Sequence, residues 1–194
     1  RQLGNLVVET TLTNDVREFH APRTMTPAEL GDSLAQLVWE SFSDFLAQGD
    51  AETPLPNIDA LHEHEERWNR TVEETLVFFL WVHTRGAQLA FMGRAPDELV
   101  RNGLNALHQA VFEDMLENGT PSSQLPMFEQ RVSTRYAEYH QAAAESDDRL
   151  GQLVSRYLVG DTNRTNLIEA ITERAVAVTN PLRDFLGDVE LVEA

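Results

Sequence analysis

Apolar residues recur every three or four positions along most of the chain, which is the pattern of helices that bury one face. No stretch alternates with the two-residue period of a strand convincingly enough to compete with this pattern. The pattern therefore predicts six helices. The first three begin at Thr26–Pro27 and end before Gly49, run from about Ile58 to Met92, and run from Pro96 to Asn118. The last three contain Phe128 to Ala143, run from Ser146 to Gly160, and contain Leu167 to Phe185 with a kink at Pro181.

Residues suited to helix ends mark several of these boundaries. Thr26 and Glu29 have the spacing of a capping box, and Ser146 is a good N-cap. We expect an all-α fold, a single-domain bundle of six or seven mostly antiparallel helices around a hydrophobic central helix. The expected division is an arm or short helix over 1–25, the bundle over 26–187 and an acidic tail over 188–194 that frays.

One stretch, Leu76–Val82, is apolar on every side of its helix. Such a helix must be covered all round, so it is either the centre of the bundle or partly an oligomer interface. The stretch and its neighbour supply the candidate interface or pocket residues Phe78, Phe79, Trp81 and His83. A histidine there is either a ligand or tuned base, or a core residue hydrogen-bonded to one neighbour; the second interpretation is favoured.

Composition excludes several chemistries. The 194 residues contain no lysine and no cysteine, so Schiff-base, phosphate-loop lysine, thiolate and disulfide chemistry are absent from this chain. The net charge of −17 argues against nucleic acid and anionic membranes as partners. The acidic surface reflects either ordinary solubility in an arginine-biased composition or adaptation to high salt. A cytoplasmic location is the default expectation.

One cluster has the residue types of a metal site. Asp59, His62 and Glu66 are spaced to share one helix face, and imidazole with carboxylate suits zinc, iron or manganese. His62 and Glu66 are the candidate ligands, with His108 or His140 as ligands from other helices. A dinuclear bundle site needs a second such motif, which the chain lacks, so a solvated first helical turn is favoured.

Two short patterns resemble known families. Residues Val82–Leu89 (VHTRGAQL) resemble the His-Arg-Gly-Gln segment of DinB-like metal-dependent helical enzymes, although Thr84 and Ala87 interrupt it. The order of elements from Phe112–Met115 onward to Ser146–Leu150 resembles that of the ubiquinol–cytochrome c chaperone proteins. No functional residue is transferred from either family.

These observations leave three functional hypotheses. The first is a non-enzymatic helical module that associates with itself or with another protein, motivated by the apolar stretch and the absence of a recognisable catalytic set. The second is a metal-dependent helical-bundle enzyme of DinB-like class, hydrolase or transferase, that uses His62 and Glu66. The third is a small-molecule-sensing domain, which differs from the first by the presence of a real cavity. No cofactor is predicted apart from the divalent metal of the second hypothesis.

Overall fold

The computed structural model describes residues 23–47 and 65–194, with the side chains of 65–68 left aside. Within these ranges the fold is all-α, with six α-helices, one short 3₁₀ helix and two three-residue strands. The elements in chain order are β1 (Arg23–Met25), α1 (Pro27–Ala47), α3 (Glu65–Phe91), α4 (Asp97–Glu117), η2 (Ser122–Gln124), α5 (Leu125–Glu145), α6 (Asp147–Val159), α7 (Thr165–Gly187) and β2 (Val189–Leu191).

The predicted helix ends are confirmed where the structure describes them. The Glu29 carboxylate accepts from the backbone N–H of Thr26 at 2.8 Å, and the Thr26 hydroxyl accepts from the N–H of Glu29 at 3.3 Å. The Ser146 hydroxyl accepts from the N–H of Arg149, and α6 ends at Gly160 with a φ of 77°. A left-handed residue of this kind is the usual way to close a helix, and glycine adopts it without steric cost.

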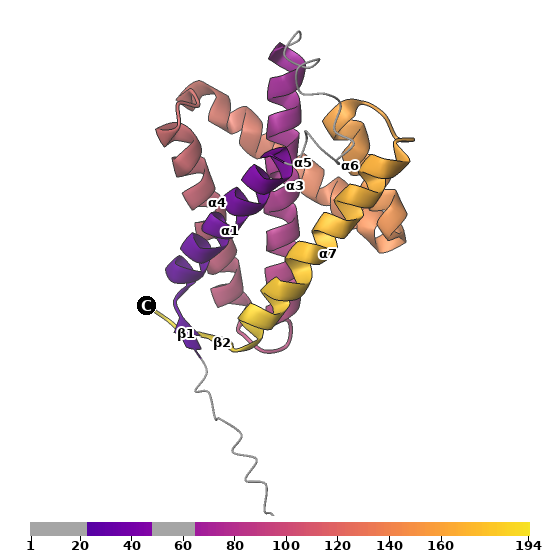
Figure 1. Ribbon diagram of the computed structural model, residues 1–194. Helices are drawn as coiled ribbons and strands as arrows, with labels where there is room; N and C mark the ends of the chain where they lie inside the picture. The colour runs from indigo at the N-terminus through magenta and orange to yellow at the C-terminus, as the bar shows by residue number, and fades with distance from the viewer. Residues whose placement is uncertain (1–22, 48–64) are drawn as a thin grey trace, which may run out of the picture.

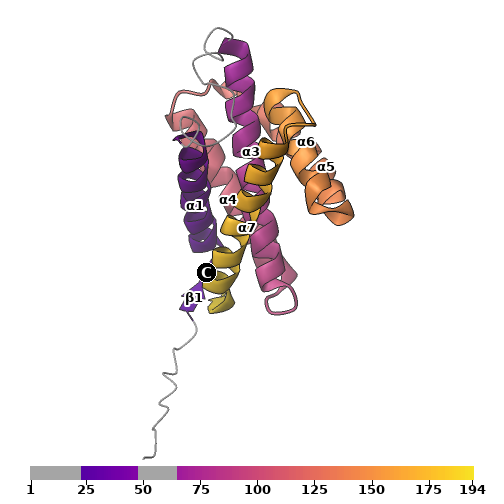
Figure 2. The same ribbon diagram turned by 45° about the vertical axis from the view of Figure 1, so that its right-hand side comes forward.

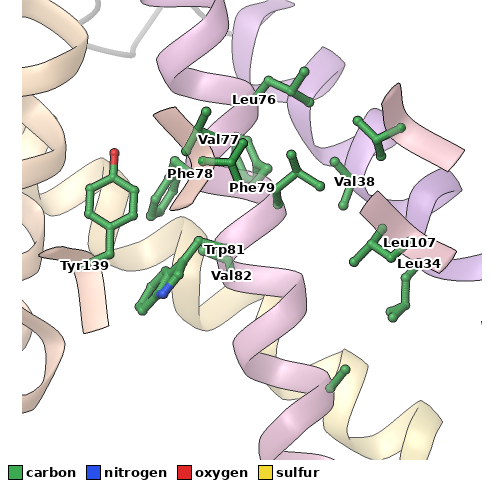
Figure 3. Packing of buried hydrophobic residues seen from close by; sticks show 14 of the residues in the cluster. Leu34, Val38, Leu76, Val77, Phe78, Phe79, Trp81, Val82, Leu107 and Tyr139 are labelled. Carbon is green, nitrogen blue, oxygen red and sulfur yellow. The ribbon is translucent and has the colours of Figure 1, made fainter. Parts of the chain in front are cut away.

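Helix α3 is the centre of the bundle. It runs through the middle of the molecule, with α1 and α4 on one side and α7 crossing obliquely along it (Figures 1 and 2). Every residue of Leu76–Val82 is buried. Phe79 packs against Phe45 of α1, with the ring centres 5.5 Å apart, while Phe78 and Trp81 face Tyr139 of α5 (Figure 3). The chain's own helices therefore cover this stretch on all sides.

Two glycines allow helices to approach closely. A Cβ at Gly31 would lie 2.5 Å from the Cβ of Ala106, so α1 and α4 pack at a distance that only glycine permits. A Cβ at Gly86 would lie 2.9 Å from Leu182, which brings α7 against α3. These contacts draw α1 toward α4 and α7 toward α3, and α1 also packs against α3.

The end of the chain differs from the prediction. The sequence predicts that the tail over 188–194 frays, yet Val189–Leu191 pairs in parallel with Arg23–Met25, and Val189 and Leu191 are buried. The prediction of fraying is therefore wrong for this segment. Its local pattern is too short to indicate a strand, and its partner lies at the other end of the described chain.

None of the helices in the described part of the chain is both long enough and apolar enough to cross a bilayer.

Candidate functional site

The predicted metal ligands are not brought into a described site. His62 lies outside the described residues, as does the side chain of Glu66. Across 23–47 and 65–194, no group of three or more histidine or acidic side chains is arranged to hold a metal ion. His108 and His140 are both described: His108 is half-buried between helices, and His140 is exposed on α5.

The candidate interface residues are placed in the core. Phe78, Phe79 and Trp81 are 1%, 0% and 6% exposed, so they present no free face to a partner. His83, at 2% exposed, also belongs to α3, but it borders open space. The structure therefore separates His83 from the three aromatic residues with which the sequence grouped it.

His83 lies in a groove of about 460 Å³ between α1 and α7. This α1–α7 groove has a polar wall from α1, an apolar wall mainly from α7, and His83 of α3 between them. Its lining residues are Ser33, Gln36, Leu37, Glu40, Ser41, His83, Ala177, Val178, Pro181, Leu182 and Phe185.

The hydrogen bonding of His83 defines the state of its ring. Nδ1 lies 2.7 Å from the carbonyl oxygen of Phe79, one turn earlier in α3. Because a carbonyl can only accept, Nδ1 carries the proton and Nε2 is left as an acceptor. Burial lowers the pKa of His83 to about 4, against a smaller opposing effect of the bond to Phe79, so the ring is neutral at pH 7. Among the described residues, Nε2 has no hydrogen-bond partner.

A second histidine, His108 of α4, is bonded through both ring nitrogens. His108 Nδ1 donates to the carbonyl of Leu104 at 2.6 Å, and the Tyr136 hydroxyl donates to His108 Nε2 at 2.7 Å. The Thr84 hydroxyl, 3.3 Å away, completes the chain by donating to the Tyr136 oxygen. Burial lowers the pKa of His108 and raises that of Tyr136, which keeps both groups neutral at pH 7.

A buried ion pair joins α3 to α5. Glu74, 1% exposed, accepts two hydrogen bonds from Arg135 of α5, at 2.9 and 2.8 Å. The Arg135 guanidinium also lies 3.5 Å from the ring centre of Tyr157 in α6. Arg135 also pairs with Glu138, three residues later in α5, at 3.5 Å, but Glu74 is the closer partner. This network joins α3, α5 and α6 and gives Arg135 a structural role.

Sequence reasoning missed most of the groove. His83 was singled out, but the polar wall of Ser33, Gln36 and Glu40 was not, because these residues read as the solvent face of an amphipathic helix. The available signal was Pro181, since a proline inside a helix leaves a carbonyl without its usual partner. Nothing in the sequence indicates that Ala177, whose carbonyl loses this partner, and His83 line one groove.

The chain matches no protein-family model, and no curated protein or solved structure shows significant similarity to it. The two short resemblances given by the sequence thus stay predictions, and the function rests on the geometry alone.

Proposed function

We propose that this protein binds a small molecule in the α1–α7 groove. The observation that carries the proposal is His83, a nearly fully buried side chain whose Nε2 acceptor lies in a groove without a partner among the described residues. Within the described residues the Tyr139 hydroxyl is the only fully buried side-chain polar atom without a partner, so Nε2 of His83 reaches solvent, and a ligand donor would take the place of water at this acceptor. The groove volume also falls within the range of roughly 300–1,000 Å³ that small-molecule sites occupy.

The lining of the groove suits an amphiphilic ligand. Val178, Leu182 and Phe185 provide an apolar wall, while Ser33 and Gln36 provide hydrogen-bonding groups opposite it. Ligand sites typically combine such an apolar surface with a few polar groups that fix orientation. Of the three hypotheses from the sequence, this is the small-molecule domain.

The other two hypotheses have less support. Self-association or a protein partner was motivated by Leu76–Val82, and that stretch is buried within the chain itself. The metal-dependent enzyme requires His62 and Glu66, and no described residues gather into a ligand set to which they could be added. We therefore put neither forward.

A fluorescent probe tests the proposal. N-phenyl-1-naphthylamine is neutral, fluoresces in apolar surroundings and carries one N–H donor for His83. We expect it to bind in a 1:1 ratio, and Ala177→Trp to abolish binding because Ala177 is exposed and lines the groove. Val176→Trp is the matched control, since Val176 is 50% exposed on the same helix and lies outside the groove.

Two results would overturn the proposal. One is a wild-type protein that does not bind the probe in a 1:1 ratio. The other is a correctly folded Ala177→Trp variant that binds as tightly as Val176→Trp, because binding would then lie elsewhere.

A further inference from the structure

We infer that the α1–α7 groove selects a cationic amphiphile, a ligand with an ammonium group at one end of an apolar body. This inference rests on the proposed function and specifies its ligand class. It follows from a census of the hydrogen-bonding groups and charges that line the groove.

Three of the lining groups can only accept a hydrogen bond. His83 Nε2 is an acceptor, because Nδ1 holds the ring proton. The carbonyl of Ala177 cannot accept the helical hydrogen bond from residue 181, because Pro181 has no N–H. The Glu40 carboxylate is the third acceptor, and both Ala177 and Glu40 line the groove with His83. A ligand that satisfies this set has to supply donors.

The described lining of the groove carries negative charge and no positive charge. Glu40 is the only charged side chain among the lining residues that the structure describes, and no arginine accompanies it. Glu40 accepts one hydrogen bond from the Gln36 amide at 3.0 Å, which orients the carboxylate on the polar wall without neutralising it. An anionic ligand would meet this carboxylate and the lone pair of His83 with no compensating cation.

The rest of the protein reinforces this preference. The net charge of −17 makes the surrounding potential negative and raises the local concentration of cations. The apolar wall gives the ligand body a surface to bury, with Leu37 of α1 adding to the side chains of α7. Charge and shape together favour an amine on an aromatic or aliphatic body over an acid or a neutral molecule of equal size.

Three ligands with one body provide the test: 6-phenylhexylamine, 6-phenylhexan-1-ol and 6-phenylhexanoate, titrated by calorimetry at pH 7.5. We expect the amine to bind about tenfold more tightly than the alcohol, because it adds a charge-assisted hydrogen bond and a partly screened ion pair. We expect the carboxylate to bind more weakly than the alcohol. Raising the salt concentration should reduce the amine's advantage, since Glu40 is exposed.

A variant without the charge of Glu40 tests whether this residue causes the preference for the amine. Glu40→Gln should bring the affinity for the amine down to that for the alcohol and leave the alcohol unchanged. Glu117→Gln removes one charge from an exposed position on α4 outside this groove, so it should preserve the amine's advantage.

The outcomes separate this inference from the proposed function. If the alcohol binds and the amine binds no better, or if Glu40→Gln and Glu117→Gln behave alike, the ligand class is wrong while the groove remains a binding site. If none of the three ligands binds while N-phenyl-1-naphthylamine does, the ligand class is likewise wrong; if that probe does not bind either, the proposed function fails and the inference falls with it.

Discussion

Two histidines of the bundle, His83 of α3 and His108 of α4, have opposite surroundings at their second ring nitrogen. His83 and His108 each donate from Nδ1 to the carbonyl one turn earlier in their own helix, at 2.7 and 2.6 Å. Tyr136 of α5 occupies Nε2 of His108. By contrast, Nε2 of His83 has no partner among the described residues and lies in the groove between α1 and α7.

The comparison distinguishes a structural histidine from a candidate binding group. The local bond is common to both rings and sets the same tautomer in each, so it carries no functional information. What differs is the second nitrogen, which depends on residues distant in the chain. Around α5 the buried polar groups are nearly all paired, and this side holds the fold together, whereas the groove side leaves an acceptor for a ligand.

The largest expected effect is on the paired side. Glu74→Gln leaves the Arg135 guanidinium without its buried counter-charge, and we expect a loss of about 3 kcal/mol in the free energy of unfolding, measured by urea denaturation. Glu73→Gln is the matched control, because Glu73 pairs with Arg131 while 39% exposed, and it should cost less than about 1 kcal/mol. Equal losses in the two variants would show that burial of the pair does not matter.

The next effect is a pH dependence of the free energy of unfolding that His83 causes. Its pKa is about 4 in the folded protein against an ordinary value of 6.5, so the unfolded chain binds the proton more readily. The contribution of the neutral His83 ring to the free energy of unfolding is complete above pH 6.5 and is lost as the pH falls toward 4.

Between pH 7.5 and 5 the wild type should therefore lose about 2 kcal/mol more stability than His83→Leu. The other titratable groups are the same in both proteins, so the difference between the two urea series isolates His83. Parallel losses in the two proteins would contradict the burial of a neutral ring.

A smaller effect is expected when Nε2 of His108 loses its hydrogen-bond partner and so comes to resemble Nε2 of His83. Tyr136→Phe removes the donor to His108 Nε2 and should cost about 1 kcal/mol of unfolding free energy, because it removes one hydrogen bond to a half-buried acceptor. Binding of N-phenyl-1-naphthylamine in the α1–α7 groove should not change. A variant as stable as the wild type would mean that the Tyr136–His108 bond contributes nothing.

The smallest effect concerns the one exception on the paired side. The Tyr139 hydroxyl is buried and has no hydrogen-bond partner within the described residues. Tyr139→Phe removes that hydroxyl while keeping the ring against Phe78 and Trp81, so thermal unfolding should show unchanged stability or a gain of up to about 1 kcal/mol. A clear loss of stability would reveal a partner for the hydroxyl.

Much of the fold could be predicted from local patterns, and little of the site could. The capping box at Thr26 and the all-round apolar stretch at Leu76–Val82 lie within single helices, where periodicity and end residues suffice. The bond between Glu74 and Arg135 joins residues 61 positions apart, and the strand at Val189–Leu191 depends on a partner near the beginning of the chain. No local pattern carries such pairings.

The sequence by itself determined an acidic, lysine-free and cysteine-free helical bundle with a central apolar helix, because helix periodicity, capping and composition are properties of neighbouring residues. Only the tertiary structure decided which histidine is bonded through both ring nitrogens and which is not, because the second partner of each ring comes from a distant part of the chain. Gly31 brings α1 against α4 and Gly86 brings α3 against α7, and His83 lines the groove between α1 and α7.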